Sequence, residues 1–129
     1  MTTASLRDED VLVYRFDSGD GSLWLARQLA ESWLRDRRVR SDAIPDLLLA
    51  INELCTGPVD NVVLRARVDG PDIEVEVETS APDVFTALAT PLGDLRLAAA
   101  VCDEVVLRVT QDHTAVIARR HGVVLPEPQ

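Results

Sequence analysis

The sequence predicts an α+β fold, a two-layer sandwich in which one mostly antiparallel sheet has its apolar face covered by helices. Stretches with apolar residues at helical spacing lie among shorter stretches in which apolar and polar residues alternate. Their order is strand, helix, helix, strand, strand, short helix, helix, strand, strand. Clean alternation is typical of strands with one buried face, and a few helices are enough to cover that face.

The first half of the chain is expected to hold an edge strand and two helices. Residues 11–16 alternate enough for an edge strand, and from Ser22 apolar residues recur at helical spacing up to the arginine-rich run RDRRVR. Within this helical stretch Trp33 is expected to be interior. Ser41 or Asp42 can cap the next helix, whose wide apolar stripe ends near the Gly-Pro pair at 57–58. Proline prevents a smooth continuation of that helix.

The second half is expected to hold two hairpins and a further helix. Residues 62–68 read VVLRARV and residues 73–77 read IEVEV, so the turn residues at 69–72 join them into an antiparallel hairpin. The remaining expected elements are a loop or short helix over 84–88, a third long helix that starts at Gly93 or Asp94 and carries Leu95, Leu97, Ala98, Val101 and Cys102, and two closing strands at 105–110 and 114–119 joined by a turn at 111–113.

Length and hydropathy predict one compact domain. A chain of 129 residues with 47% hydrophobic content can bury a single core. We expect a flexible N-terminus at 1–10, the domain at 11–120 and an irregular tail at 121–129. The polar start and the lack of a long apolar run argue against a signal peptide and a membrane span, so a cytoplasmic protein is expected.

The excess of acidic over basic residues limits the kinds of partner that this chain is expected to bind. The chain has 13 basic and 22 acidic residues and a net charge of −9, which would repel a phosphate backbone, so nucleic-acid binding is not expected. The acidic charge fits either general solubility or a basic protein partner. All of the lysine and arginine positions hold arginine, which excludes lysine-dependent chemistry such as a P-loop or a Schiff base. Cys55 and Cys102 lie in apolar helical patterns and are interpreted as core residues rather than as reactive thiols.

The pattern of segments from about Tyr14 to Arg120 resembles the anti-sigma factor and serine kinase branch of the histidine-kinase-like ATPase superfamily. The segments that carry the resemblance are YRFDSGDGSLWLARQLAESWL, DLLLAINELCTG, IEVEVETSAPD, GDLRLAAAVCDEVVLR and DHTAVIARR. They follow the order and spacing of that family's elements, although no single motif is complete. The resemblance implies the Bergerat fold, which is a two-layer sandwich of the kind described above.

The resemblance implies a nucleotide site, whose first motif is incomplete. In the family a helix glutamate polarises the attacking group, and an asparagine one turn later holds Mg²⁺. Glu53 matches the glutamate, but the asparagine position is Gly57, which offers no oxygen ligand, and Pro58 breaks the helix there. Asn52 and Asn61 are close in sequence but not on the face that the spacing requires.

The second motif departs further from the family. Its adenine-binding aspartate and two glycines are replaced by Thr79, Ala81 and Asp83. The glycine-rich lid is reduced to TALATPLGD, and Asp94 stands where a glycine precedes the next helix, so the anion site at that helix N-terminus would hold the protein's own carboxylate. We therefore expect an eroded pocket lined by Glu53, Gly57, Thr79, Ala81, Asp83 and Asp94, with no cofactor and no metal.

Three hypotheses for function follow. The first is a non-catalytic regulatory module that binds a sigma factor or a STAS-type anti-anti-sigma protein. The second is an active ATP-dependent serine kinase with divergent motifs, which requires Glu53 and Asn61 to converge on a metal; otherwise Glu53 is expected to be solvated or to cap a helix. The third is a subunit of a larger sensor, in which this domain dimerises or packs against a partner domain.

The candidate partner surface is the first helix with the arginines that follow it. Those arginines are Arg35, Arg37, Arg38 and Arg40. Cations at the end of a helix also complement its dipole, so a structural role for them is an equal alternative. Homodimerisation is left open. His113, in a turn, and His121, in the tail, have no acidic partner that the sequence places beside them, which argues against a catalytic triad or a metal site.

Overall fold

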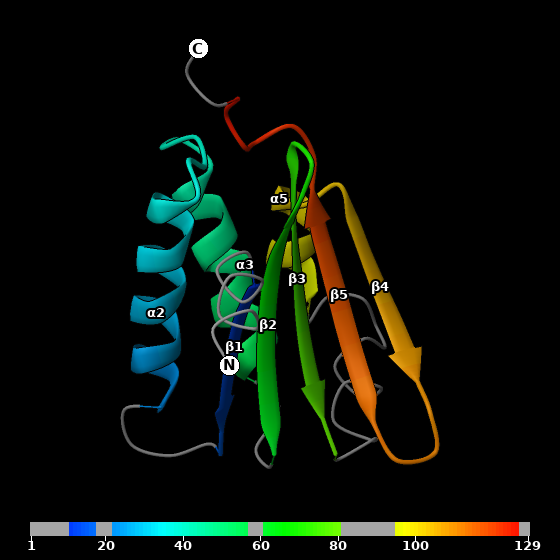
Figure 1. Cartoon of the computed structure of the whole chain (residues 1–129). Coiled ribbons are helices and arrows are strands. Elements are labelled where there is room, and N and C mark those ends of the chain that lie inside the picture. Colours follow the sequence, from blue (N-terminus) through cyan, green and yellow to red (C-terminus); the bar gives the residue numbers. More distant parts are fainter. Residues whose placement is uncertain (1–10, 18–21, 57–60, 81–94, 127–129) are drawn as a thin grey trace, which may run out of the picture.

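The computed structural model describes residues 11–17, 22–56, 61–80 and 95–126. Its antiparallel sheet has the strand order β1-β2-β3-β5-β4, and helices pack against one face of that sheet (Figure 1). In chain order the elements are β1 (Val11–Phe16), α2 (Ser22–Asp36), α3 (Ile44–Thr56), β2 (Val62–Asp69), β3 (Asp72–Thr79), α5 (Arg96–Val101), β4 (Glu104–Val109) and β5 (Thr114–Arg120). This arrangement confirms the predicted α+β sandwich.

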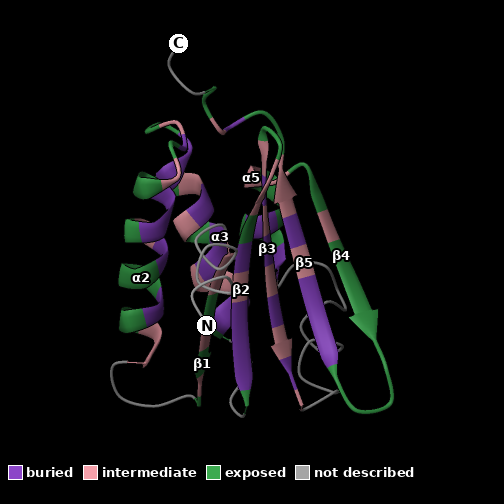
Figure 2. Cartoon of the chain, in the orientation of Figure 1, coloured by how far each residue is buried: buried purple, intermediate pink, exposed green. Residues whose placement is uncertain are grey.

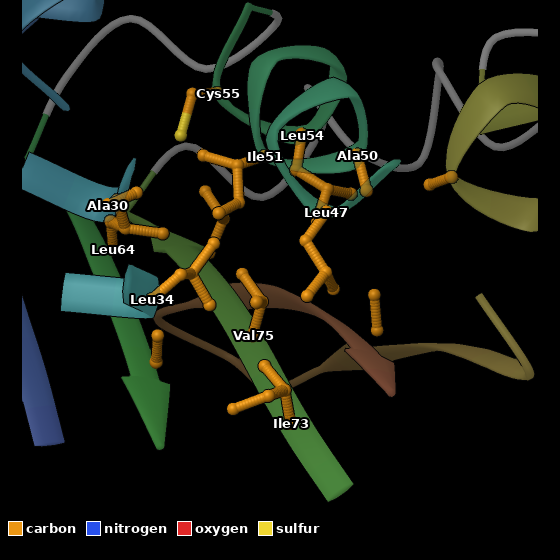
Figure 3. Close-up of a cluster of buried hydrophobic side chains, with 14 of the residues drawn as sticks. Ala30, Leu34, Leu47, Ala50, Ile51, Leu54, Cys55, Leu64, Ile73 and Val75 are labelled. Carbon is orange, nitrogen blue, oxygen red and sulfur yellow. The ribbon is translucent and has the colours of Figure 1, made fainter. Parts of the chain in front are cut away.

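Alternate residues of the central strands form the core. In β3, Ile73, Val75 and Val77 are buried, whereas the glutamates between them are partly exposed. The register places Leu64 and Ala66 of β2 opposite Val77 and Val75, so these side chains share the face that the helices cover. Figure 3 shows the helix side chains that meet them: Ala30 and Leu34 from α2, and Leu47, Ala50, Ile51, Leu54 and Cys55 from α3.

Trp33 and Cys55 lie in this core, as the apolar pattern predicted. Burial raises the pKa of the Cys55 thiol to about 12. Burial is also the main reason why the pKa of Cys102, which is half-buried, is raised to about 11. Both thiols therefore stay protonated at neutral pH, which makes them poor nucleophiles and poor metal ligands.

The opposite face of the sheet carries ion pairs. Glu74, Glu76 and Glu78 form a row along β3, and arginines from the neighbouring strands flank the row on both sides. The pairs are Arg65 with Glu76 and Glu78, Arg67 with Glu74, Arg108 with Glu76, and Arg119 with Glu74. Ion pairs at the surface each stabilise a fold by only about 0–1 kcal/mol, and these pairs are partly exposed. Their main effect is to keep this face of the sheet compatible with water.

The helix before β4 is shorter than predicted. Helix α5 spans Arg96–Val101, and Cys102, which we expected inside the helix, has an extended backbone with φ −112° and ψ 152°. The N–H of Asp103 then donates to the carbonyl of Arg119 in β5 at 2.8 Å. Backbone hydrogen bonds to β5 thus replace hydrogen bonds within the helix from Asp103 onward. The expected helix start at 93–94 lies outside the described residues. Within the described part of the chain, no helix is long and apolar enough to cross a membrane.

The segment after β5 is held against the rest of the domain. The N–H groups of Val123 and Val124 both donate to the carbonyl of Pro71, in the β2–β3 turn, at 2.8 and 2.9 Å. The N–H of Arg40 donates to the carbonyl of Val123 at 2.8 Å, and Val124 forms an isolated bridge with Val39. Val123 is fully buried. Residues 121–126 therefore join the β2–β3 turn to the connection between α2 and α3.

Candidate functional site

Glu53, the residue that matches the family's catalytic glutamate, caps a helix in this structure. It lies on α3, and its two carboxylate oxygens accept hydrogen bonds from the backbone N–H groups of Leu97, at 3.1 Å, and Ala98, at 2.6 Å. These N–H groups belong to the first turn of α5, whose own N-cap residue, Leu95, makes no side-chain capping bond. A residue distant in sequence thus supplies the cap that α5 lacks locally.

This arrangement fits the electrostatics of a helix N-terminus. The first N–H groups of a helix have no partner within it, and their aligned dipoles favour a negative charge. We expected a carboxylate of the protein to occupy this site and named Asp94, which lies outside the described residues. Among the described residues, the carboxylate that does so belongs to Glu53. To polarise a hydroxyl or bind Mg²⁺, this carboxylate would have to serve that partner in addition to, or instead of, the two N–H groups of α5.

Asn61, the other residue that the kinase hypothesis needs, has different partners. Its backbone is left-handed, with φ 49°, a conformation that asparagine tolerates better than most residues. Its N–H donates to Asp17 Oδ1 at 2.7 Å, and its side-chain Nδ2 donates to Ser80 Oγ at 3.1 Å. Asn61 therefore ties the end of β1 to the end of β3, while Glu53 is bonded to α5. In the described ranges no group of three or more His, Cys, Asp or Glu side chains could hold a metal ion.

Thr79 is the other residue of the expected pocket that the structure describes. It is fully buried at the end of β3, where the register places it opposite Thr114, which is also fully buried. Thr79 lines a hollow of about 410 Å³, whose other described lining residues are Arg15, Asn61, Val63, Glu78, Ser80 and His113. Glu53 does not line this hollow. Gly57, Ala81, Asp83 and Asp94 lie outside the described residues.

The arginines predicted as a partner surface make contacts within the domain. Arg35 pairs with Glu31 one turn earlier on α2, at 2.7 Å. The guanidinium of Arg37 lies over the ring of Trp33, 5.3 Å from its centre, which is a cation–π geometry. Both contacts are made with residues of α2 itself, near its C-terminal end. The Arg35 side chain nevertheless remains largely exposed.

Arg38 and Arg40 hold the C-terminal segment. Arg38 Nη2 donates to the carbonyl of Pro126 at 3.0 Å, and Arg40 Nη1 donates to the carbonyl of Gly122 at 3.2 Å. Arg40 Nε also pairs with Asp42 at 3.0 Å. These contacts support the structural reading of Arg38 and Arg40, because their guanidinium groups are already used to fix residues 121–126. Of the four arginines, Arg35 is the one best placed to meet a partner.

His121 has acidic partners that the sequence did not reveal. Its Nδ1 lies 3.1 Å from Asp72 Oδ2, and its Nε2 lies 3.0 Å from Glu104 Oε2. The hydrogen bond with Asp72 is the main reason why the pKa of His121 is raised. The N–H of Gly122 and then His121 lower the pKa of Asp72. Because Ile73 pairs with Arg120 in the sheet, Asp72 and His121 are brought together by the adjacency of β3 and β5.

Solved structures share this architecture. A chain in the crystal structure of the RsbU and RsbW domains of Rv1364c from Mycobacterium tuberculosis matches with a TM-score of 0.71 and 17% identity, over 90% of this chain and 33% of that chain. A chain in the SiaB-SiaC complex from Pseudomonas aeruginosa matches with a TM-score of 0.62 and 9% identity, over 93% of this chain and 95% of that chain. No family model and no curated protein matches the sequence.

These matches confirm the fold that the resemblance implied. The chain shares its α+β fold with the chain that holds the RsbU and RsbW domains and with the chain from the SiaB-SiaC complex. It spans about a third of the chain that holds the RsbU and RsbW domains. At 17% and 9% identity the likeness concerns the fold, and function has to be argued from the residues of this chain.

We expect Glu53→Gln to lower the free energy of unfolding by about 1–2 kcal/mol, because the neutral amide keeps one acceptor oxygen and loses the charge at the N-terminus of α5. Urea denaturation followed by circular dichroism measures the change. The matched control is Glu31→Gln, which removes an exposed carboxylate paired within α2 and should cost about 0–0.5 kcal/mol. Equal losses in the two variants would show that Glu53 is not a stabilising cap.

The pair formed by His121 and Asp72 predicts a dependence of stability on pH. Its histidine contribution is fully present below the ordinary histidine pKa of 6.5 and is lost as pH rises through the raised pKa of the folded state. Its aspartate contribution is present above the ordinary value of 3.8 and is lost as pH falls through the lowered folded value. The pair is therefore most stabilising between these two ordinary values.

NMR titration of the His121 ring should show a pKa above 6.5 in the wild type. Asp72→Asn should bring this pKa down toward its ordinary value, since Asp72 is its main cause. Glu104→Gln should lower it less, because the charge of Glu104 contributes least among the causes. A His121 pKa that Asp72→Asn leaves unchanged would contradict the assignment.

Proposed function

We propose that this chain is a non-catalytic regulatory module of the anti-sigma-factor type, which binds a sigma factor or a STAS-type anti-anti-sigma protein and binds ATP weakly or not at all. The observation that carries the proposal is the bonding of both Glu53 carboxylate oxygens to the first turn of α5. The fold supports the regulatory part of the proposal by analogy with proteins of that fold.

The chemistry of phosphoryl transfer explains why the Glu53 contacts matter. A kinase of this fold needs a carboxylate that is available to the attacking hydroxyl and an oxygen ligand for Mg²⁺ one helical turn later. Here the carboxylate is engaged by two N–H donors, and the ligand position holds Gly57. A proton taken up by Glu53, or a rotation of its side chain toward a substrate, would weaken these two hydrogen bonds, so catalysis by Glu53 would compete with the capping of α5.

The partner surface that we propose is the outer face of α2. Trp24 is 61% exposed, and Leu25 and Leu29 are also exposed one turn apart from each other. Arg35 extends this face toward the end of the helix with a largely exposed side chain. Exposed tryptophan and arginine are the residue types that most often dominate the binding energy of protein interfaces. One of the similar structures is itself a complex of two proteins, SiaB and SiaC.

The first test is calorimetric titration with Mg-ATP. We expect no binding in the micromolar range, because the magnesium ligand is missing and Glu53 is bonded to α5. A kinase of the same fold with an intact glutamate–asparagine pair serves as the positive control. Micromolar binding that Glu53→Gln abolishes would contradict the proposal and would favour an active serine kinase.

The second test addresses the partner. The immobilised protein should capture a sigma factor or a STAS-type protein from a lysate of its own source, and purified partner should then bind directly. Trp24→Asp and Arg35→Glu should each weaken this binding at least about tenfold, as expected for interface hot spots. Val13→Asp is the matched control, because Val13 is an apolar residue on β1 that is 49% exposed, and this change should leave the binding unchanged. Recovery of no transcription-related protein would contradict the proposal.

A further inference from the structure

The hollow that Thr79 lines opens on the face of the sheet that points away from the helices. The register aligns Arg15 of β1, Val63 of β2 and Glu78 of β3 in one row across the sheet, and all three line the hollow. Opposite residues of an antiparallel ladder lie on the same face. Figure 2 shows buried and partly exposed residues alternating along β3, and Glu78 is one of the partly exposed residues between the core positions. The row therefore lies on the opposite face from α5 and its cap Glu53, which belong to the helix layer.

Three polar residues line the hollow at the same end of the sheet. Asn61 precedes β2, Ser80 follows β3 and His113 precedes β5, so the antiparallel order of these strands brings them together. Asn61 Nδ2 donates to Ser80 Oγ at 3.1 Å. An amide nitrogen carries two hydrogens, and a hydroxyl that accepts one hydrogen bond can still donate another. Among the described contacts, Asn61 and Ser80 therefore each retain a donor for a ligand in the hollow.

Arg15 and Glu78 place opposite charges on two sides of the hollow. Arg15 is exposed, and no described carboxylate pairs with its guanidinium. Glu78 bonds Arg65 through Oε1 at 3.0 Å, and within the described ranges its Oε2 has no partner. Two strand spacings, about 9–10 Å in total, separate the backbones of Arg15 and Glu78, with Val63 between them. A small group held above Val63 can therefore contact both charged side chains.

We propose that this hollow binds an α-amino acid, a small molecule with a carboxylate and an ammonium group on one carbon atom. The guanidinium of Arg15 binds the carboxylate, to which Asn61 and Ser80 each donate one further hydrogen bond. Oε2 of Glu78 accepts a hydrogen bond from the ammonium group. The volume of about 410 Å³ lies within the range of roughly 300–1,000 Å³ that is typical of small-molecule sites.

The charges around the hollow favour an amino acid over a simple anion or a simple amine. A phosphate group carries about 1.5–2 negative charges at neutral pH, so it would meet one arginine while Glu78 repels it. A lone carboxylate would likewise leave Glu78 facing a negative charge, and a lone amine would be repelled by Arg15. A molecule that carries both charges is attracted to both sides of the hollow.

The position of the hollow makes this site independent of the proposed partner surface. The hollow lies on the open face of the sheet, whereas α2 lies in the helix layer on the other face (Figure 1). Binding of an amino acid also requires neither Glu53 nor a metal ion. Failure of the partner proposal and absence of amino acid binding are therefore distinguishable, since each is tested with its own ligand and its own variants.

NMR titration of the backbone amide signals tests the proposal with glycine, which carries the two charged groups without a side chain. Glycine should shift the signals of Asn61, Ser80 and His113 with a dissociation constant of about 1–10 mM, as expected for a small ligand in a hollow that is open to solvent. Acetate and methylamine each lack one of the two charges, so at equal ionic strength each should bind at least about tenfold more weakly.

Variants of the two charged residues test the assigned contacts. Arg15→Gln and Glu78→Gln should each raise the dissociation constant for glycine about tenfold. The matched controls are Arg67→Gln and Glu74→Gln, which lie on the same face at the other end of the sheet and should leave it unchanged. The proposal would be overturned by glycine that shifts none of these signals, by acetate or inorganic phosphate that binds as tightly as glycine, or by Arg15→Gln and Glu78→Gln variants that bind glycine like the wild type. The remaining amide signals report whether each variant is folded.

Discussion

The apolar residues of the central strands can leave water only if helices cover one face of the sheet, and most features of the molecule follow from that constraint. Ile73, Val75 and Val77 share this face with Leu64 and Ala66, and α2 and α3 close over them. The side chains in between must then point to the opposite face, where glutamates and arginines pair in water. The helix layer also determines where α3 meets α5, which is the location of Glu53.

Glu53 connects the fold to the proposed function. Helix α5 is short and has no capping side chain at its N-cap residue, so its first N–H groups depend on an acceptor from another element. The carboxylate of Glu53 satisfies them from α3. A residue that would be catalytic in an active kinase of this fold thereby stabilises the packing between two helices. The use of Glu53 as a cap, together with a glycine at position 57 where the resemblance implies a magnesium ligand, supports the proposal of a fold retained for binding.

The two ends of the sheet differ in how they meet solvent. At one end α2 lies beside β1 and exposes Trp24, and at the other end β4 exposes its backbone edge with little charge at its centre. The guanidinium groups of Arg38 and Arg40 donate hydrogen bonds to backbone carbonyls of the C-terminal segment. His121 in that segment contacts both Asp72 and Glu104. Among the described residues, the exposed apolar side chains at the two ends of the sheet thus lie on a helix face and on a strand edge.

Local patterns in the sequence were enough to predict the order of the described elements, the buried face of β3 and the interior position of Trp33, because alternation and helical spacing reflect which side of a single element meets the core. The end of α5 at Cys102 was not predictable, since pairing with β5 decides it. The α5 partners of Glu53 and the Asp72 partner of His121 were also hidden, because these bonded residues lie 44 or more positions apart in sequence. Of the expected pocket, the structure places Glu53 and Thr79. Sequence alone determined which residues are buried and which chemical groups are present, and tertiary structure decided which donors and charges those groups meet, because such contacts depend on how distant elements pack.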